Sequence, residues 1–293
     1  MSYIVYNDNC FEWLKKAEPN SITAVITDPP YGVKEYTEVE IDKLREGHGG
    51  VWRIPPAFDG HKRAPLPRFS VINEDPKLTK EVFDFFSKWS QLIYKVIVPG
   101  GHLFIASTPL LADIVSYAIR QSGFERRGEI IRTVVTFRGG DRPKGAEEEF
   151  KHLSVIPRGL FEPWLLFRKP ISEKTVAENL RKWNAGALRR EEKDIPFSDI
   201  IESTKTPKSE RDISKHPSLK PQAFLRKLVF AALPMEKGVI LDTFSGSGST
   251  LAASEFYNYD SIGIECDPEF YNQSLVSIPK LSKLYPKIPQ LPF

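Results

Sequence analysis

Short apolar runs alternate with amphipathic stretches along this chain, and that alternation limits the folds open to it. The runs ITAVI at 22–26 and GVILDTF at 238–244 are short and apolar enough to be buried strands. Stretches such as 83–97 and 221–233 carry apolar residues at helical spacing instead. Strands that alternate with helices are typical of a doubly wound α/β fold with a mostly parallel sheet, and this is the fold we expect.

Glycine and proline mark the expected ends of two helices. The helix over 83–97 is followed by Pro99-Gly100-Gly101, and the helix over 110–122 is followed by Gly123. Glycine adopts the left-handed conformation that closes many helices, and proline cannot continue one. We therefore expect both helices to end at these residues.

Two segments lack the periodicity of the sheet and divide the chain. Residues 33–70 are charged and rich in proline, and a loop of this length in a compact domain is usually functional or disordered. We expect a mobile loop there. Residues 171–216 are polar and of mixed charge, which favours a small inserted lobe between an N-terminal part, 1–170, and a C-terminal part, 217–293, of one main domain.

The composition is that of an ordinary globular protein. Hydrophobic residues make up 41% and charged residues 27%, and the net charge of +3 does not by itself indicate a nucleic-acid partner. Cys10, Cys266 and the five histidines show no metal-ligand spacing. No signal peptide opens the chain, and no apolar run approaches the length of a membrane span. We expect a soluble cytoplasmic protein without a metal site or a membrane partner.

The sequence VILDTFSGSGSTLAAS predicts a glycine-rich turn between a strand and a helix. Asp242 ends the strand, Gly246 and Gly248 form the turn, and the helix begins at Ser249 or Thr250. Glycines let the backbone approach a ligand, and a helix N-terminus offers N–H groups to an anionic group such as a carboxylate. A tight structural turn without a ligand is the alternative interpretation.

An acid at the end of the next strand extends this pattern. Glu265 ends the run SIGIE, roughly 20 residues beyond the turn, where an acid accepts hydrogen bonds from ribose hydroxyls in nucleotide-binding βαβ units. The turn differs from the dinucleotide fingerprint G-x-G-x-x-G. The pattern therefore indicates an adenosine-containing cofactor, and S-adenosylmethionine suits it better than NAD.

The motif TDPPYG directly follows the apolar run ITAVI. Pro29 and Pro30 lack N–H groups and form a stiff corner, and Asp28 stands at the carboxyl end of a strand, where open α/β sheets place ligands. The carboxylate and the proline carbonyl would hold the hydrogens of an exocyclic amino group and turn its lone pair toward an electrophile. Tyr31 would stack on the base, which is worth on the order of 1–3 kcal/mol. A strand-ending Asp-Pro turn is the alternative.

These motifs give the chain a resemblance to the DNA amino-methyltransferases, specifically to the adenine-N6 group with the target motif Asp-Pro-Pro-Tyr. The catalytic motif at 28–31 precedes the cofactor motif at 242–248, an order that resembles the beta class. The segments NDNCFEWL, GGHLFIAS and HPSLKPQAFLRKLV resemble further parts of that family, so the likeness covers most of the chain. It implies a Rossmann-like methyltransferase domain with a mostly parallel seven-stranded sheet and a target-recognition insert at 171–216.

The resemblance also implies the roles of individual residues. Asp28 and the backbone at Pro29 accept the amino hydrogens, Pro30 stiffens the motif, and Tyr31 stacks on the flipped base. Cofactor contacts are implied for Asn9, Cys10, Asp28, Lys220, Asp242, Phe244, Ser245, Gly246, Gly248, Ser249, Thr250 and Glu265.

Some members of this set carry open alternatives. Lys220 either meets the cofactor carboxylate or is a surface lysine, and Cys10 either lines the pocket or is a buried structural thiol. Two positions depart from the family pattern: Asn9 stands where many relatives have Asp, and Thr243 replaces the usual proline after Asp242.

The implied reaction is direct methyl transfer from S-adenosylmethionine to N6 of an adenine flipped out of duplex DNA. Alternative substrates are cytosine N4, for which such enzymes usually carry Ser at the place of Asp28, an RNA adenine, or a protein glutamine. A catalytically silent DNA-binding subunit of a modification complex is a further alternative.

Double-stranded DNA is the partner that the resemblance implies. Candidate DNA contacts are Arg138, Arg142, Lys144, Lys182, Arg189, Arg190, Lys205, Lys208 and Arg211. A solvated basic surface is the alternative for these residues. A cognate restriction endonuclease and a homodimer stay open.

Overall fold

The structure is a computed structural model, and it describes residues 3–29, 76–137, 142–155, 157–214, 216 and 218–285. The loop expected over 33–70 lies outside the described residues, as do three predicted site residues, Pro30, Tyr31 and Arg138.

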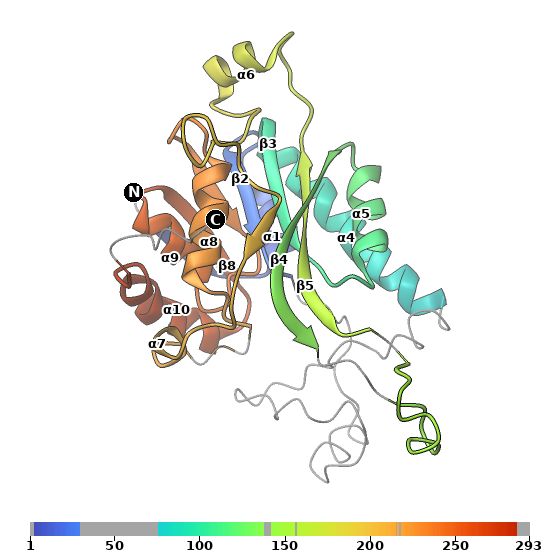
Figure 1. Cartoon of the computed structure of the whole chain (residues 1–293). Coiled ribbons are helices and arrows are strands. Elements are labelled where there is room, and N and C mark those ends of the chain that lie inside the picture. The colour runs from blue at the N-terminus through green and yellow to red at the C-terminus, as the bar shows by residue number, and fades with distance from the viewer. Residues whose placement is uncertain are drawn as a thin grey trace.

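Within the described residues, eight strands form one sheet in the order β1-β8-β7-β2-β3-β5-β4-β6 (Figure 1). Their bounds are β1 Tyr3–Asn7, β2 Ile22–Thr27, β3 Ile97–Ala106, β4 Glu125–Phe137, β5 Gly159–Arg168, β6 Ile200–Glu202, β7 Val239–Asp242 and β8 Asp260–Glu265. Only β5 runs against its neighbours β3 and β4, and the other pairs are parallel. The expected α/β fold with a mostly parallel sheet is confirmed.

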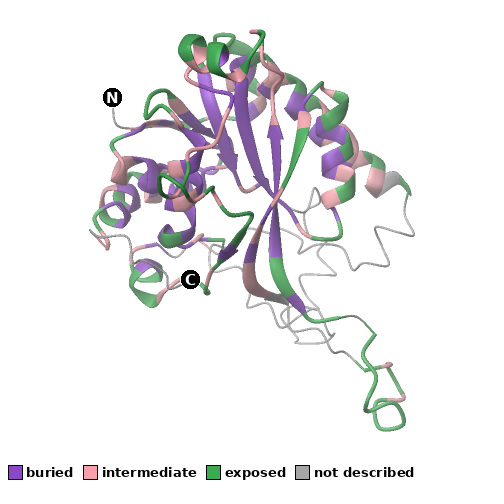
Figure 2. Cartoon of the chain, turned by 45° about the horizontal axis from the view of Figure 1, so that its top comes forward, coloured by how far each residue is buried: buried purple, intermediate pink, exposed green. Residues whose placement is uncertain are grey.

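Helices cover both faces of this sheet. Their bounds are α1 Cys10–Lys16, α4 Pro76–Val96, α5 Ala112–Gln121, α6 Val176–Trp183, α7 Lys208–Arg211, α8 Gln222–Ala232, α9 Ser249–Phe256 and α10 Pro268–Leu281. In β2 and β3, Val25 and Leu103 face the core shared with α1, α4 and α5, whereas Ile26 and Phe104 face the core shared with α8. Successive strand residues point to opposite faces, so the central strands are buried throughout (Figure 2).

Strand β6, which brings the sheet to eight strands, comes from the segment expected to be a separate lobe. Residues 171–216 contribute α6, β6 and α7, and β6 pairs in parallel with β4 at Ile131–Thr133. The sheet therefore has one strand more than the seven that the resemblance implies. The division of the chain into a main domain and a recognition insert stays a prediction.

The glycines after the first long helix serve a strand instead of a helix end. Helix α4 ends at Val96, and β3 begins at once with Ile97, so Pro99, Gly100 and Gly101 lie inside β3. A Cβ atom on Gly101 would lie 2.8 Å from the carbonyl oxygen of Thr23, so glycine permits the close approach of β2. The helix expected over 83–97 ends one residue earlier, at Val96, and the interpretation of Pro99-Gly100-Gly101 as its terminator is wrong, because these residues lie inside β3.

The second expected helix end is confirmed. Helix α5 ends at Gln121, and Gly123 follows with φ of +94°, the left-handed conformation that glycine adopts readily.

In the described ranges, no helix has both the length and the apolar character that crossing a bilayer requires.

Candidate active site

The carboxyl ends of β2 and β7 lie side by side in the middle of the sheet. These strands pair at Ala24–Ile240 and Val25–Leu241. Immediately beyond, Thr27 Oγ1 donates a hydrogen bond to Asp242 Oδ1 at 2.7 Å, across 215 positions of sequence. The structure thus brings the DPPYG motif, through its described residues Asp28 and Pro29, next to the strand that leads into the glycine turn.

This edge of the sheet is also a topological switch point. Helix α4, which follows β2, places Trp89 in the core on one face, and α9, which follows β7, places Ala253 in the core on the other face. Adjacent parallel strands whose crossovers leave to opposite faces open a crevice at their carboxyl ends, where ligands bind in folds of this type.

Lys220 is paired with the carboxylate of Asp28. Its ammonium contacts Asp28 Oδ2 and lies 3.2 Å from Glu162 Oε1, and the side chain of Lys220 is 11% exposed. Burial alone would lower the pKa of Lys220, but the charges of Asp28 and Glu162 raise it above its ordinary value. Lys220 is therefore a largely buried cation at the carboxyl end of β2, which excludes the surface-lysine alternative.

A second ion pair lies behind Lys220, and it was missed from the sequence. Arg132 of β4 and Glu162 of β5 are cross-strand partners, and Arg132 Nη1 lies 2.8 Å from Glu162 Oε2. Burial alone would raise the pKa of Glu162, but Lys220 and Arg132 bring it below its ordinary value. A charged residue inside a short apolar run, in IIRTVV and in FEPWLLF, was the available signal.

The glycine turn is joined directly to Glu265 at the end of β8. Gly246 adopts φ of +51°, and its N–H donates to Glu265 Oε2 at 2.8 Å, while the N–H of Asp267 donates to Oε1 at 2.8 Å. Glu265 is buried, with 7% of the residue exposed. Because each carboxylate oxygen can accept more than one hydrogen bond, Glu265 retains the capacity to accept from a ribose.

The residues of this turn fit an adenosine-containing group. The hydroxyls of Ser245 and Ser247 are buried and have no hydrogen-bond partner in the part of the chain that the structure describes. A Cβ atom on Gly246 would lie 2.8 Å from His216 Nε2, so the close contact with His216 requires a glycine. Buried hydroxyls without a partner, in the turn that donates to the carboxylate of Glu265, are what a polar ligand would complete.

Asp242 holds the corner together from within the protein. It is 3% exposed and accepts hydrogen bonds from Thr27 Oγ1 at 2.7 Å and from the N–H of Phe244 at 3.2 Å. Burial raises the pKa of Asp242 to about 6, although the hydrogen bonds from Thr27 and Thr250 oppose this effect.

Other predicted cofactor residues make structural contacts here. Asn9 caps α1 by accepting from the N–H of Phe11 at 2.9 Å, and Gly248 caps α9 with φ of +84°. The backbone oxygen of Ser249 accepts from Gln222 Nε2 at 2.9 Å. These contacts neither exclude nor require a cofactor, so the cofactor roles of these residues stay predictions.

Cys10 and Thr243 each have a specific local environment. Burial raises the pKa of the Cys10 thiol to about 12, so it is not a thiolate nucleophile. Thr243, which stands in place of the usual proline, accepts from Trp89 Nε1 at 3.2 Å through its hydroxyl. The neighbouring Phe244 packs against Phe85 and Trp89.

The predicted DNA contacts fall at two opposite edges of the sheet. Lys182 lies on α6, which is fixed to the start of β3 by the 2.9 Å hydrogen bond from Asn179 Nδ2 to the oxygen of Pro99. The backbone N–H of Arg189 donates to the backbone oxygen of Ala231 near the end of α8, so Arg189 and its neighbour Arg190 lie at that same edge. Figure 1 shows α6 at the end of the molecule opposite to the arrowhead of β4.

The remaining candidates follow β4 or β6, which run in the same direction as β2. They are therefore at the edge that carries Asp28, and all are exposed: Arg142, Lys144, Lys205, Lys208 and Arg211. Of the nine predicted contacts, these five lie at the edge that carries Asp28, and their contact with DNA stays a prediction.

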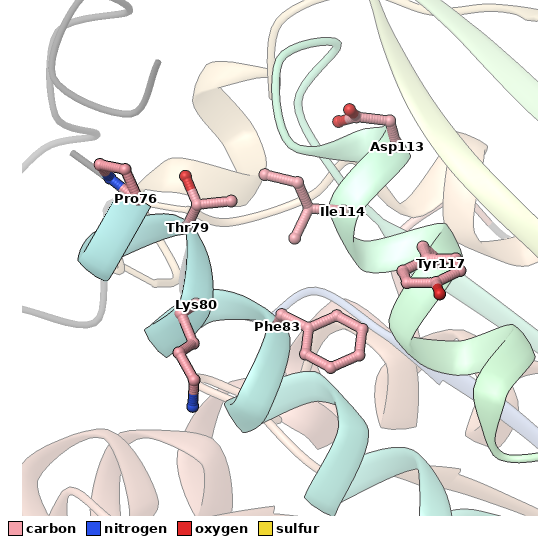
Figure 3. A pocket seen from close by; sticks show the side chains of 7 residues that line it. All are labelled: Pro76, Thr79, Lys80, Phe83, Asp113, Ile114 and Tyr117. Atoms are coloured by element: carbon pink, nitrogen blue, oxygen red, sulfur yellow. The ribbon is translucent and has the colours of Figure 1, made fainter. Parts of the chain in front are cut away.

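A groove of about 480 Å³ lies away from this corner, between α4 and α5 (Figure 3). Phe83 and Tyr117 line it, with ring centroids 5.6 Å apart. No predicted catalytic or cofactor residue lines it.

Comparison with known proteins places the chain among DNA-modifying enzymes. A family model described as DNA methylase, of the N6/N4 type, matches residues 22–276. The chain is 28% identical over 292 residues to the Type II methyltransferase M.HindIII of Haemophilus influenzae, with 92% of each protein covered. It is 24% identical over 267 residues to the Type II methyltransferase M2.DpnII of Streptococcus pneumoniae, with 91% of this chain and 86% of that protein covered.

Two solved structures share the fold. The PvuII DNA methyltransferase, which is cytosine-N4-specific, superposes with a TM-score of 0.59 at 14% identity, covering 98% of this chain and 93% of that one. M1.HpyAVI, in a complex with S-adenosylmethionine, superposes with a TM-score of 0.53 at 15% identity, covering 93% of this chain and 97% of that one. At these identities the likeness establishes the fold alone.

Proposed function

Because the chain belongs to the DNA methylase family, we propose that it methylates the N6 amino group of an adenine flipped out of duplex DNA, with S-adenosylmethionine as the methyl donor. The observation that carries the proposal is the contact between the ends of β2 and β7. The 2.7 Å hydrogen bond from Thr27 to Asp242 sets Asp28 beside the strand that leads into the glycine turn. An amino group held at Asp28 would thus lie next to a cofactor held at the turn.

The cofactor would be held by residues of β7, α9 and β8. Glu265 would accept the ribose hydroxyls, and the turn from Ser245 to Gly248 would line the site with backbone N–H groups and buried hydroxyls. S-adenosylmethionine, when bound, supplies an electrophilic methyl group on a sulfonium centre. The chain itself therefore needs no nucleophile, in agreement with the buried, protonated thiol of Cys10.

Asp28 would hold and orient the attacking amine. An ionised carboxylate is an acceptor only, and the ion pair with Lys220 is consistent with that ionised form. Together with the carbonyl at Pro29, it would accept the two amino hydrogens and turn the nitrogen lone pair toward the methyl group. The amine becomes strongly acidic only after methylation, so the proton can leave late, and most of the rate would come from alignment and preorganised acceptors.

Cytosine N4 is a second candidate for the methylated atom. The fold is shared with a cytosine-N4-specific enzyme, and the family model covers enzymes of both the N6 and the N4 type. Both are exocyclic amines that two converging acceptors can orient. Asp28 favours adenine, because enzymes of the cytosine-N4 group usually carry Ser at this place.

The proposal is tested by the identity of the methylated nucleoside. The protein is incubated with tritiated S-adenosylmethionine and methylation-free duplex DNA, and the DNA is digested to nucleosides and separated by chromatography. We expect the label in N6-methyladenine. A parallel incubation uses RNA in place of DNA. Label in N4-methylcytosine would move the assignment to the second candidate, and label in the RNA alone would exclude DNA as the substrate. No label in either nucleic acid would contradict the assignment as a methyltransferase.

Duplex DNA would approach along the edge that carries Asp28, over the exposed Lys205, Lys208 and Arg211. We expect the enzyme to act in the cytoplasm, where its DNA substrate lies. The Type II methyltransferases to which the chain is similar suggest a restriction-modification setting. A cognate endonuclease and a homodimer stay predictions.

A further inference from the structure

A buried chain of alternating charges runs from the interior of the sheet to the catalytic corner. Arg132 pairs with Glu162, and the ammonium of Lys220 lies between Glu162 and Asp28. The side chains of Arg132, Glu162, Lys220 and Asp28 are 6%, 10%, 11% and 17% exposed. The pattern is therefore cation, anion, cation and anion, and its last member is the proposed acceptor of the amino hydrogens.

Stability does not account for such a chain. Removing charges from water is costly, and well-packed apolar residues in place of a buried ion pair often leave a protein equally or more stable. Apolar neighbours are available at this place, because Trp164 and Phe224 pack together beside Arg132. A role in the chemistry at Asp28 gives these charges a reason to be there.

The two oxygens of Glu162 have different partners. Oε2 accepts from Arg132 Nη1 at 2.8 Å and from Trp164 Nε1 at 3.3 Å, whereas Oε1 faces Lys220 at 3.2 Å. Arg132 is itself fixed, because it donates at 3.0 Å both to Ser203 Oγ and to the oxygen of Thr204. These contacts hold the carboxylate of Glu162 in place. The ammonium of Lys220 therefore has a second, immobile carboxylate at 3.2 Å.

We infer that Glu162 is a positioning residue for methyl transfer: it shares the ammonium of Lys220 with Asp28 and so leaves Asp28 able to take up the amino hydrogens of the target base. This inference rests on the proposed function. An ammonium held by Asp28 alone would form a strong charge-assisted bond that a neutral amino group displaces at high cost. Glu162 offsets that cost, because the ammonium moves toward Oε1 when the base occupies Asp28.

The same two strands offer a matched control. Glu125 of β4 and Arg168 of β5 are also cross-strand partners, and Arg168 Nη2 lies 2.6 Å from Glu125 Oε2. This pair lies at the other end of the ladder, away from Asp28. Glu125→Gln and Glu162→Gln thus make the same change of charge in the same pair of strands.

The experiment compares the two variants in methyl transfer to methylation-free duplex DNA. We expect Glu162→Gln to lower kcat by at least about tenfold and Glu125→Gln to change it by less than about twofold. Cofactor Kd by calorimetry should be close to wild type for both variants, since both leave Glu265 and its hydrogen bond from Gly246 in place. We expect Glu162→Gln to lower Tm more than Glu125→Gln, because it leaves the buried Arg132 and Lys220 without their shared carboxylate, so kcat is compared well below both Tm values. Equal kcat values for the two variants would overturn the inference.

A double-substitution cycle with Lys220→Met separates positioning from a structural role. If Glu162 acts through Lys220, adding Glu162→Gln to Lys220→Met lowers kcat by less than about threefold, and the two losses do not multiply. Losses that multiply would show that Glu162 acts independently of Lys220, which contradicts the inference.

A second variant covers the case in which Glu162→Gln does not fold. Arg132→Lys keeps the charge but loses the planar fork that fixes Glu162, so we expect kcat to fall by about threefold or more. A wild-type kcat in this variant would count against the inference. Failure of the proposed function is distinct, because the wild-type protein itself would then methylate no DNA.

Discussion

Lys220 reaches the carboxylate of Asp28 from a segment 192 positions further along the chain. The contact joins the loop before α8 to the end of β2, and both side chains are largely buried. The ion pair holds the carboxylate of Asp28 in one orientation, so Asp28 is not a mobile surface acid, and we expect it to serve as a preorganised acceptor.

Replacing Asp28 should abolish catalysis without abolishing cofactor binding. In Asp28→Ala the amino hydrogens lose an acceptor, and we expect kcat to fall on the order of 100-fold to 1,000-fold, as for the loss of other preorganised polar groups. Cofactor affinity, measured by calorimetry, should survive because Glu265 and the glycine turn are unchanged. Parallel loss of cofactor binding and activity would contradict the role assigned to Asp28.

Replacing Glu265 should have the opposite signature. Glu265→Gln removes a charged acceptor, whose hydrogen bonds contribute about 1.5–3 kcal/mol, so cofactor Kd should rise by about tenfold or more. At saturating cofactor, kcat should fall much less. The exposed Glu269, at the start of α10, supplies the control, and Glu269→Gln should bind the cofactor like wild type.

The meeting of the two motifs could be predicted, because parallel strands end at the same edge of a sheet. Asp28 and Asp242 each follow a recognisable apolar run, and their place at one edge needs only the α/β fold, whereas their direct contact depends on the strand order that sets β7 beside β2. The partners Glu162 and Arg132 could not be predicted. A charge within an apolar strand indicates that some partner exists, but register and strand order decide which one, and neither is local in the sequence.

Short elements and glycines were the other limits. Strand β6, Ile200–Glu202, is too short to show the alternation that marks a strand in a sequence. Gly101 had the appearance of a helix terminator, yet its role depends on the carbonyl of Thr23 in a neighbouring strand. Tertiary contact overrode local propensity in both places.

The stability of the protein should fall as the pH rises through the range in which Asp242 ionises. The pKa of Asp242 is raised from 3.8 to about 6 by burial, so the folded state binds more protons than the unfolded state between these values. The ionised carboxylate therefore costs stability in full above pH 6, on the order of 3 kcal/mol, and costs none below pH 4. Asp242→Asn should remove this pH dependence.

Thermal unfolding at a series of pH values checks the role of Asp242. The Tm of Asp242→Asn should exceed that of wild type at pH 7, and the two values should converge toward pH 4. A difference in Tm that is the same at every pH would show that Asp242 is not the titrating group. Cofactor binding of this variant reports separately on whether the carboxylate also contacts the ligand.

The opposite placement of Lys205 and Lys182 predicts a difference in how DNA binding depends on salt. Lys205 is exposed beyond β6, at the edge that carries Asp28, whereas Lys182 lies on α6 at the other edge, paired with Glu173 at 2.6 Å. Each phosphate contact adds about one to the slope of log affinity against log salt, so Lys205→Gln should reduce that slope by about one. Lys182→Gln should leave it unchanged. Fluorescence anisotropy with labelled duplex at several salt concentrations measures both slopes, and a reduced slope for Lys182→Gln alone would place the duplex on the wrong edge.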